Sequence, residues 1–292
     1  MQDFAYHRPL SIEAALGLMA PHGARPLAGG TDLVPQLREG RREANHVVDI
    51  KQIAGLTQIE AQPDGGLVIG AAASASSIAN HPHVVRYFPA VASACRLIGS
   101  WQIQNRASLG GNVCNAAPSA DGVPPLICYA ATARVMSRQG QRDVPVEKLF
   151  AGPGKTTLSP GEILVALCVP APAPRSAAAY LRFTPRREMD IAIAGAGVWV
   201  HLDTGGKIAG ARIALASVAP TPVRALAAEQ ALIGQAPSKI LVDAAASAAA
   251  AGCTPISDTR GSADYRRHLV GVLTRRALAD CFTSLGIKLE VA

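Results

Sequence analysis

The chain alternates short apolar runs with polar and glycine-rich breaks, a pattern typical of strands and helices packed in layers. Ser11 precedes the first helical stretch as an N-cap, and Pro124 occupies the first turn of a later one. The pattern predicts strands over 25–27, 46–50, 58–61, 67–72 and 162–169, a hairpin over 133–146, and helices over 11–20, from Asp32 to about 40, from Ser76, over 88–98 and over 124–131.

The last third of the chain orders its elements differently. The run from Pro170 to Pro174 alternates proline with alanine and is the best linker candidate. The elements expected beyond it are strands over 178–183, 190–202 and 207–218, then helices over 225–233, 238–251 and 262–284. Strands followed by helices indicate an α+β domain. We therefore predict an α/β plus α+β fold with lobes over 1–56 and 57–174, and a domain over 175–292 that holds a three-stranded antiparallel sheet and helices.

Bulk composition excludes several classes of protein. The 292 residues are 49% hydrophobic, which is enough for a real core. No apolar run approaches the roughly 20 residues that cross a bilayer, and the N-terminus, with Asp3, has no basic-then-apolar signal. We expect a cytoplasmic protein without a membrane span.

The basic residues behind the net charge of +7 are dispersed and not interleaved with aromatics, so we expect no nucleic-acid partner. They could instead face an acidic partner subunit or an anionic cofactor.

The cysteines and histidines form no recognisable ligand pattern. None of the six cysteines has a CxxC partner, and the seven histidines show no HExxH or paired spacing. We therefore predict small, buried, reduced cysteines and no metal or iron–sulfur site in this chain.

Two short motifs imitate nucleotide-binding sites but fail on context. The segment Gly152–Thr156 resembles the end of a P-loop, yet Leu149 stands where the first glycine belongs and no helix follows. Gly195 and Gly197 resemble half of a dinucleotide fingerprint, but they lie within a strand pattern. Glycines there are better explained by close approach of another backbone.

Two glycine loops carry the strongest chemical signal. The first, Ala28–Asp32, lies between a strand and a helix, and the second is Ser108–Asn112. The second segment is too glycine-rich and polar for a core element. Without a Cβ, a backbone can approach a phosphate closely, and successive N–H groups can form an anion nest. Two such loops could hold the two phosphates of a dinucleotide, whereas two ordinary tight turns would give the same local pattern.

Five signatures in chain order resemble those of FAD-binding medium subunits of the molybdenum hydroxylase, or xanthine dehydrogenase, family, similar to carbon monoxide dehydrogenase medium subunits. Together they span nearly the whole chain, which makes them more specific than either loop alone. The signatures are 27–33, 102–113 continuing to 118–121, Phe150 with 152–156, 186–192 and 261–266.

The resemblance implies a two-lobed FAD-binding domain of the vanillyl-alcohol-oxidase-like (PCMH) type, with FAD between the lobes, followed by a domain of the carbon monoxide dehydrogenase flavoprotein C-terminal type. It places the FAD pyrophosphate against Leu27, Ala28, Gly29, Gly30, Thr31, Asp32, Ser108, Leu109, Gly110, Gly111 and Asn112.

The resemblance also assigns single residues around the flavin. Asp121 is expected to hydrogen-bond flavin hydroxyls, although it could instead be a structural turn residue or N-cap. Leu164 is expected near the flavin ring or the adenine. Arg182 is expected near the isoalloxazine, where a cation would stabilise negative charge on the reduced ring, although it could instead be a solvated strand residue.

The chain departs from its relatives at the face of the flavin. Ile98 stands where animal xanthine dehydrogenases stack a phenylalanine, and Ile191 stands where several bacterial members carry a tyrosine or phenylalanine. A more aliphatic flavin face leaves the terminal acceptor open between NAD, oxygen and a membrane-linked carrier. The iron–sulfur loop that some relatives insert here is not expected, because the chain has no cysteine cluster.

The resemblance finally implies a complex, expected as a dimer of heterotrimers. A large molybdopterin subunit would oxidise the substrate, a small subunit with two [2Fe–2S] clusters would relay electrons, and the FAD of this chain would pass them on. No side chain here need act as an acid or base.

Two alternatives stay open: a self-sufficient FAD-dependent oxidase of related fold, and an interaction subunit that has lost FAD. The substrate is set by the molybdenum subunit.

Overall fold

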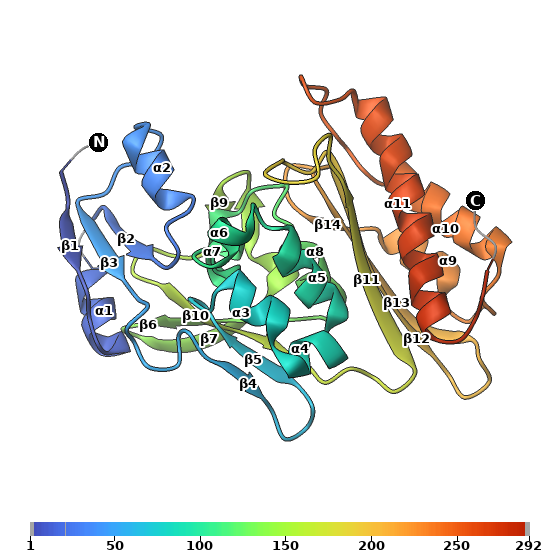
Figure 1. Ribbon diagram of the computed structural model, residues 1–292, viewed down its shortest axis with the longest axis horizontal. Coiled ribbons are helices and arrows are strands. Elements are labelled where there is room, and N and C mark those ends of the chain that lie inside the picture. The colour runs from blue at the N-terminus through green and yellow to red at the C-terminus, as the bar shows by residue number, and fades with distance from the viewer. Residues whose placement is uncertain (1–2, 21, 290–292) are drawn as a thin grey trace.

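The computed structural model describes residues 3–20 and 22–289. Its first lobe is a small parallel sheet in the order β1-β3-β2 (Figure 1). Ser11 caps α1, as expected, because its side chain accepts a hydrogen bond from the Ala14 N–H. The elements of this lobe are β1 (Ala5–His7), α1 (Ile12–Leu18), β2 (Ala24–Leu27), α2 (Leu33–Arg38) and β3 (His46–Asp49).

The core of this first lobe is completed by a later part of the chain. Its buried cluster combines Leu16, Val48 and Ile53 with Ile163 and Val165, which lie more than 100 residues further on. The small sheet therefore does not bury its apolar side chains using residues 1–56 alone.

The second lobe is a five-stranded antiparallel sheet in the order β4-β5-β10-β6-β7, with its helices gathered on one face (Figure 1). The helix expected from Ser76 is two helices separated at His81, since Pro82 begins the second. The strands and the 3₁₀ helix η1 are β4 (Ile59–Ala61), β5 (Leu67–Gly70), β6 (Thr132–Ser137), β7 (Gly140–Pro145), η1 (Val146–Lys148), β8 (Phe150–Gly152), β9 (Lys155–Thr156) and β10 (Ile163–Val169). The helices are α3 (Ala75–Asn80), α4 (Pro82–Tyr87), α5 (Pro89–Leu97), α6 (Trp101–Gln104), α7 (Leu109–Asn115) and α8 (Val123–Cys128).

The C-terminal part holds a four-stranded antiparallel sheet, so the prediction of three strands was wrong. The missed strand, β14, has two residues and pairs with β13 at Ala214 and Leu215, too short a stretch for an alternation pattern to appear. The expected strand over 190–202 begins only at Ala194. The elements are β11 (Ser176–Phe183), β12 (Ala194–Leu202), β13 (Ile208–Ala216), β14 (Val223–Arg224), α9 (Leu226–Leu232), α10 (Lys239–Ala251) and α11 (Ala263–Ser284).

This C-terminal sheet lies between two layers of helices (Figure 1). One face of β11, which includes Leu181 and Phe183, packs on the cluster formed with α10 and α11. The opposite face, which includes Ala178 and Tyr180, belongs to the core of the second lobe, against α5 and α8. Because side chains alternate along a strand, β11 presents residues to both domains at once. None of the helices in the described residues is long and apolar enough to cross a membrane.

Candidate functional site

The first glycine loop leaves β2 and enters α2 with a row of free backbone donors. Gly30 adopts a φ of +76°, the left-handed region that favours glycine. The N–H groups of Gly29, Gly30, Thr31 and Asp32 donate to no acceptor within residues 3–20 and 22–289. The Lys51 side chain is bonded to the loop, since its Nζ donates to the Ala28 carbonyl oxygen at 2.7 Å. A row of free donors of this kind can bind an anion.

Charged side chains surround this loop. Burial raises the pKa of the Asp32 carboxyl, and the positive charges of Arg41 and Arg42 partly offset that rise. Arg42 also donates to the carbonyl oxygen of Gly154, at 3.1 Å. The loop therefore combines free N–H groups with nearby cations.

The first glycine loop packs directly against the two residues that precede the second. A Cβ placed on Gly29 would come within 2.0 Å of the Arg106 carbonyl oxygen and 2.8 Å of the Ala107 Cα. The helices behind the loops are joined as well, because Gln36 of α2 donates to the Asn115 side chain of α7 at 3.0 Å. The structure thus brings together two segments that are far apart in the sequence.

The second segment is not a loop but the start of α7, which corrects the prediction that it is too polar for a core element. Ser108 is the N-cap, and its hydroxyl accepts from the Gly111 N–H at 3.0 Å. Leu109 and Gly110 are buried. A Cβ on Gly110 would meet the Ala71 carbonyl oxygen at 2.4 Å. Gly110 is therefore required for packing against the backbone near β5, a tertiary contact that composition does not reveal.

Replacing Ser108 with alanine should measure how much of its role is helix capping. Loss of one N-cap hydroxyl costs about 1 kcal/mol, so Ser108→Ala is expected to lower the free energy of unfolding by about that amount. Urea denaturation of the full chain measures it, with Ser76→Ala as the control because Ser76 is not a cap residue. An unchanged midpoint would show that the Ser108 cap contributes no measurable stability.

Asn112 connects this helix to Asp121. The Asn112 side-chain oxygen accepts from the Gly122 N–H at 3.1 Å. Asp121 itself is 7% exposed. The Tyr180 hydroxyl donates to one of its carboxylate oxygens at 2.7 Å, and Arg182 makes a buried ion pair with the other. Two residues expected at the flavin, Asp121 and Arg182, are therefore directly bonded across the two domains.

The structure excludes a solvated strand position for Arg182 and an N-cap role for Asp121. The Arg182 side chain is 6% exposed, so it is not a solvated strand residue. Asp121 is not the N-cap of α8, a position that Gly122 occupies. Burial raises the pKa of the Asp121 carboxyl to about 6, against the lowering effects of the Arg182 charge and the Tyr180 hydrogen bond. The pKa of this carboxyl therefore lies well above its ordinary value of 3.8.

The apolar residues expected near the flavin occupy different environments. Leu164 lies on β10, is 4% exposed and belongs to the core of the second lobe. Ile98 ends α5 and is also buried, whereas Ile191 is 47% exposed. The loop that carries Ile191 contacts the segment after Ile98, because the Met189 N–H donates to the Gly99 carbonyl oxygen at 3.4 Å.

Sequence reasoning missed Tyr180 and Lys51. The spacing of Tyr180 and Arg182 was available as a signal, since residues i and i+2 share one face of a strand. Lys51 had no such signal, because its contact with Ala28 depends on the pairing of β2 with β3.

The structure explains the two motifs that imitate nucleotide-binding sites, residues 152–156 and Gly195 with Gly197. Residues 152–156 form part of the β8–β9 hairpin, which is followed by no helix. The Gly154 N–H donates to the Ala116 carbonyl oxygen at the end of α7. Gly197 lets β12 approach α8, since its Cβ would lie 3.1 Å from Pro124. The expected close approach of backbone is confirmed at Gly197, whereas the neighbour of Gly195 is a side chain, that of Tyr180.

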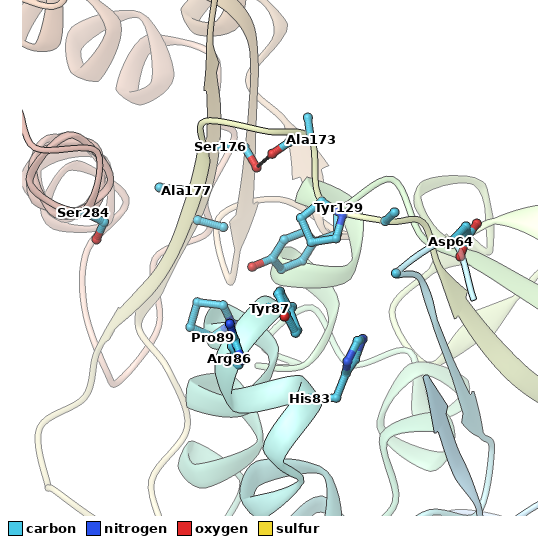
Figure 2. Close-up of a pocket in the computed structure, with 14 residues that line it drawn as sticks. Asp64, His83, Arg86, Tyr87, Pro89, Tyr129, Ala173, Ser176, Ala177 and Ser284 are labelled. Atoms are coloured by element: carbon cyan, nitrogen blue, oxygen red, sulfur yellow. Dashed lines mark hydrogen bonds between the residues drawn. The ribbon is translucent and has the colours of Figure 1, made fainter. Parts of the chain in front are cut away.

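A cavity of about 600 Å³ lies away from these loops, between the two domains. Figure 2 shows Arg86 and Tyr87 of α4 facing it, together with Tyr129 and the start of β11. None of the residues expected to bind FAD lines it. A second cavity, of about 410 Å³, includes Arg182 in its wall beside α11. Within the described residues, no group of three or more His, Cys, Asp or Glu side chains could hold a metal ion.

Comparison with known families gives two matches that together cover most of the chain. The family described as "FAD binding domain in molybdopterin dehydrogenase" matches residues 2–172. The "CO dehydrogenase flavoprotein C-terminal domain" matches residues 179–281.

Individual relatives match along their whole length. The xanthine dehydrogenase FAD-binding subunit of Escherichia coli O157:H7 is 35% identical over 294 residues, which cover 99% of this chain and 100% of that protein. The carbon monoxide dehydrogenase medium chain of Hydrogenophaga pseudoflava is 35% identical over 277 residues, covering 94% and 96%.

Solved structures agree with these relatives in fold. A structure of carbon monoxide dehydrogenase from Hydrogenophaga pseudoflava that lacks the Mo-pyranopterin moiety superposes with a TM-score of 0.92 at 35% identity, covering 97% of this chain and 98% of that one. Quinoline 2-oxidoreductase from Pseudomonas putida 86 gives a TM-score of 0.90 at 27% identity, covering 97% and 98%.

Proposed function

Since the chain belongs to the FAD-binding medium subunits of the molybdopterin dehydrogenase family, we propose that its two glycine segments anchor FAD and that it carries electrons from an iron–sulfur partner to a terminal acceptor. The chain is the flavoprotein subunit of a heteromeric molybdenum hydroxylase, an oxidoreductase. The observation that carries the proposal is the row of free N–H groups from Gly29 to Asp32 beside the start of α7.

The residues at this place fit a pyrophosphate. Four free N–H groups and the N-terminal turn of α7 supply donors, and α7 contributes partial positive charge at that end. Gly29 and Gly110 make the assembly possible, because a Cβ on either would collide with backbone. The Arg41 and Arg42 charges would offset the repulsion between the phosphates and Asp32.

FAD supplies reversible two-electron chemistry between one-electron carriers and the acceptor. The protein holds and orients it. We assign the pyrophosphate to Leu27–Asp32 and Ser108–Asn112, and the surroundings of the flavin to Ile98, Asp121, Leu164 and Arg182. Asn112 would fix the turn that carries Asp121, and the buried pair of Asp121 with Arg182 would set the charge near the ring.

The remaining parts of the complex are proposed by analogy with the relatives. The matching proteins include subunits of enzymes that act on xanthine and carbon monoxide. We infer a large partner with a molybdopterin cofactor and a small partner with two [2Fe–2S] clusters, assembled as a dimer of heterotrimers. We also propose 1–56, 57–174 and 175–292 as the units of the chain, which the separate sheets support.

Flavin analysis of the native complex tests the proposal. We expect one FAD per chain, released by acid, together with iron and molybdenum in the complex. A colourless complex without FAD would refute the proposed function. FAD bound in the purified chain, with substrate turnover in the absence of partners, would instead favour a self-sufficient oxidase.

Gly111→Val separates the phosphate role of the second segment from its packing role. The closest atom to a Cβ at Gly111 is the Ser108 Oγ, at 2.9 Å, whereas a Cβ at Gly110 would strike backbone. We expect Gly111→Val to fold and to bind FAD at least about tenfold more weakly, equivalent to about 1.4 kcal/mol. Equilibrium titration of the deflavinated chain with FAD measures this. Ser76→Ala, within α3 and outside the proposed site, is the control, and a wild-type FAD affinity of Gly111→Val would refute the role of Gly111.

A further inference from the structure

We propose that Tyr180 is a positioning residue for the flavin: its hydroxyl fixes the Asp121 carboxylate and thereby the charge that Arg182 presents at the flavin site. This inference rests on the proposed function. The Tyr180 hydroxyl lies 2.7 Å from Asp121 Oδ1, while Arg182 bonds Oδ2. Tyr180 is 3% exposed, so water does not compete for this contact.

The fold builds a specific slot for the Tyr180 phenol. On the neighbouring strand β12, a Cβ at Gly195 would lie 2.7 Å from the Tyr180 hydroxyl. Gly195 is paired with Arg182, and Gly197 with Tyr180. Any larger residue at Gly195 would therefore displace the phenol from Asp121. Gly195, which resembles part of a dinucleotide fingerprint in the sequence, thus makes room for the hydrogen bond between Tyr180 and Asp121.

The Tyr180 hydrogen bond affects the charge of Asp121. The titratable groups that face Asp121 in the described residues are Arg182 and Tyr180, both on β11. Burial raises the pKa of the Asp121 carboxyl to about 6, and the Tyr180 hydrogen bond acts in the opposite direction. Without the hydroxyl the pKa of Asp121 should rise further, because the charged form loses a donor. More of the carboxyl is then neutral at a given pH, and the Arg182 charge is less compensated.

The experiment is potentiometric titration of the FAD-loaded complex carrying Tyr180→Phe, across neutral pH. We expect FAD to remain bound and its midpoint potential to rise, since an uncompensated cation favours the electron-rich flavin. The pH at which the slope of the potential changes should move upward. Tyr129→Phe is the control. It removes another buried phenol from the same core, where Tyr129 packs edge-on against Phe88 with ring centroids 5.3 Å apart.

A double-mutant cycle with Asp121→Asn tests whether Tyr180 acts through Asp121. Asparagine has the same shape but does not ionise, so Tyr180→Phe should shift the potential no further in this background. A shift of equal size in both backgrounds, or one no larger than that of Tyr129→Phe, would overturn the proposal.

A second measurement needs no flavin, and it keeps this inference separate from the proposed function. The pH dependence of urea unfolding of the full chain includes the titration of Asp121, and comparison with Asp121→Asn isolates it. Tyr180→Phe should move that titration to higher pH, and an unmoved titration would also overturn the proposal. Absence of FAD from the wild-type complex would refute the proposed function, and with it the flavin role of Tyr180. The unfolding data alone would then test whether the Tyr180 hydroxyl lowers the pKa of Asp121.

Discussion

Replacing Gly29 with alanine is expected to release FAD and to lower the free energy of unfolding by about 3 kcal/mol, the upper end of the range for overpacking. The new Cβ would lie 2.0 Å from the Arg106 carbonyl oxygen and 2.6 Å from its carbonyl carbon. Backbone atoms cannot rotate away as the end of a side chain can. The first loop must therefore move away from the residues that lead into α7, and its free N–H groups would move with it.

Two measurements on the same preparation check this prediction. Urea denaturation gives the stability, and the flavin absorbance per chain gives the FAD content. Gly17→Ala is the matched control, since Gly17 lies within α1 and its Cβ would meet only the end of Arg138, at 3.5 Å. That control should be stabilised by up to about 1 kcal/mol, because alanine is the better helix former. A Gly29→Ala chain as stable as wild type and fully loaded with FAD would show that the two segments need not touch.

Replacing Arg182 with methionine should cost about 3–5 kcal/mol at neutral pH, because it leaves the Asp121 carboxylate buried without its ionic partner. The cost should depend on pH. Burial raises the pKa of Asp121 from 3.8 to about 6. Folding therefore favours the protonated carboxyl. The stability that this group contributes is fully present below about pH 3.8 and is lost as the pH rises through about 6.

Loss of the Arg182 charge should raise the pKa of Asp121 further, since that charge lowers it in the wild type. The penalty of Arg182→Met should then shrink in mildly acidic buffer, where the carboxyl is protonated. Urea denaturation at acidic and at neutral pH measures the difference. The double variant Asp121→Asn with Arg182→Met is the control, because it removes both charges and should recover most of the loss. A penalty that does not change with pH would show that the carboxyl does not titrate as stated.

Much of the fold could be predicted because its signals are local. The serine before α1 and the continuous apolar run of β10 depend on neighbouring residues, and these elements appear close to where they are expected. The C-terminal sheet shows the limit of such patterns. Its fourth strand has only two residues, and its place is set by pairing with β13.

The candidate site shows the same limit more clearly. Glycine content identified residues 108–112, but it could not show that Gly110 is packed against Ala71. The bond between Asp121 and Arg182 joins residues that are 61 positions apart. Their types were expected from family resemblance, whereas their direct contact depends on how the C-terminal sheet lies on the second lobe. Tertiary packing, which no local window contains, decides both features.

The shared core of the first lobe has a consequence for biosynthesis. Residues 1–56 leave the ribosome long before Ile163 and Val165, which complete their apolar cluster. The nascent lobe should therefore stay open while more than 100 further residues are translated, unlike a domain that folds as soon as it emerges. Arg182 follows later still. Cofactor loading should thus be one of the last events in the maturation of this chain, after β10 and β11 have taken their places.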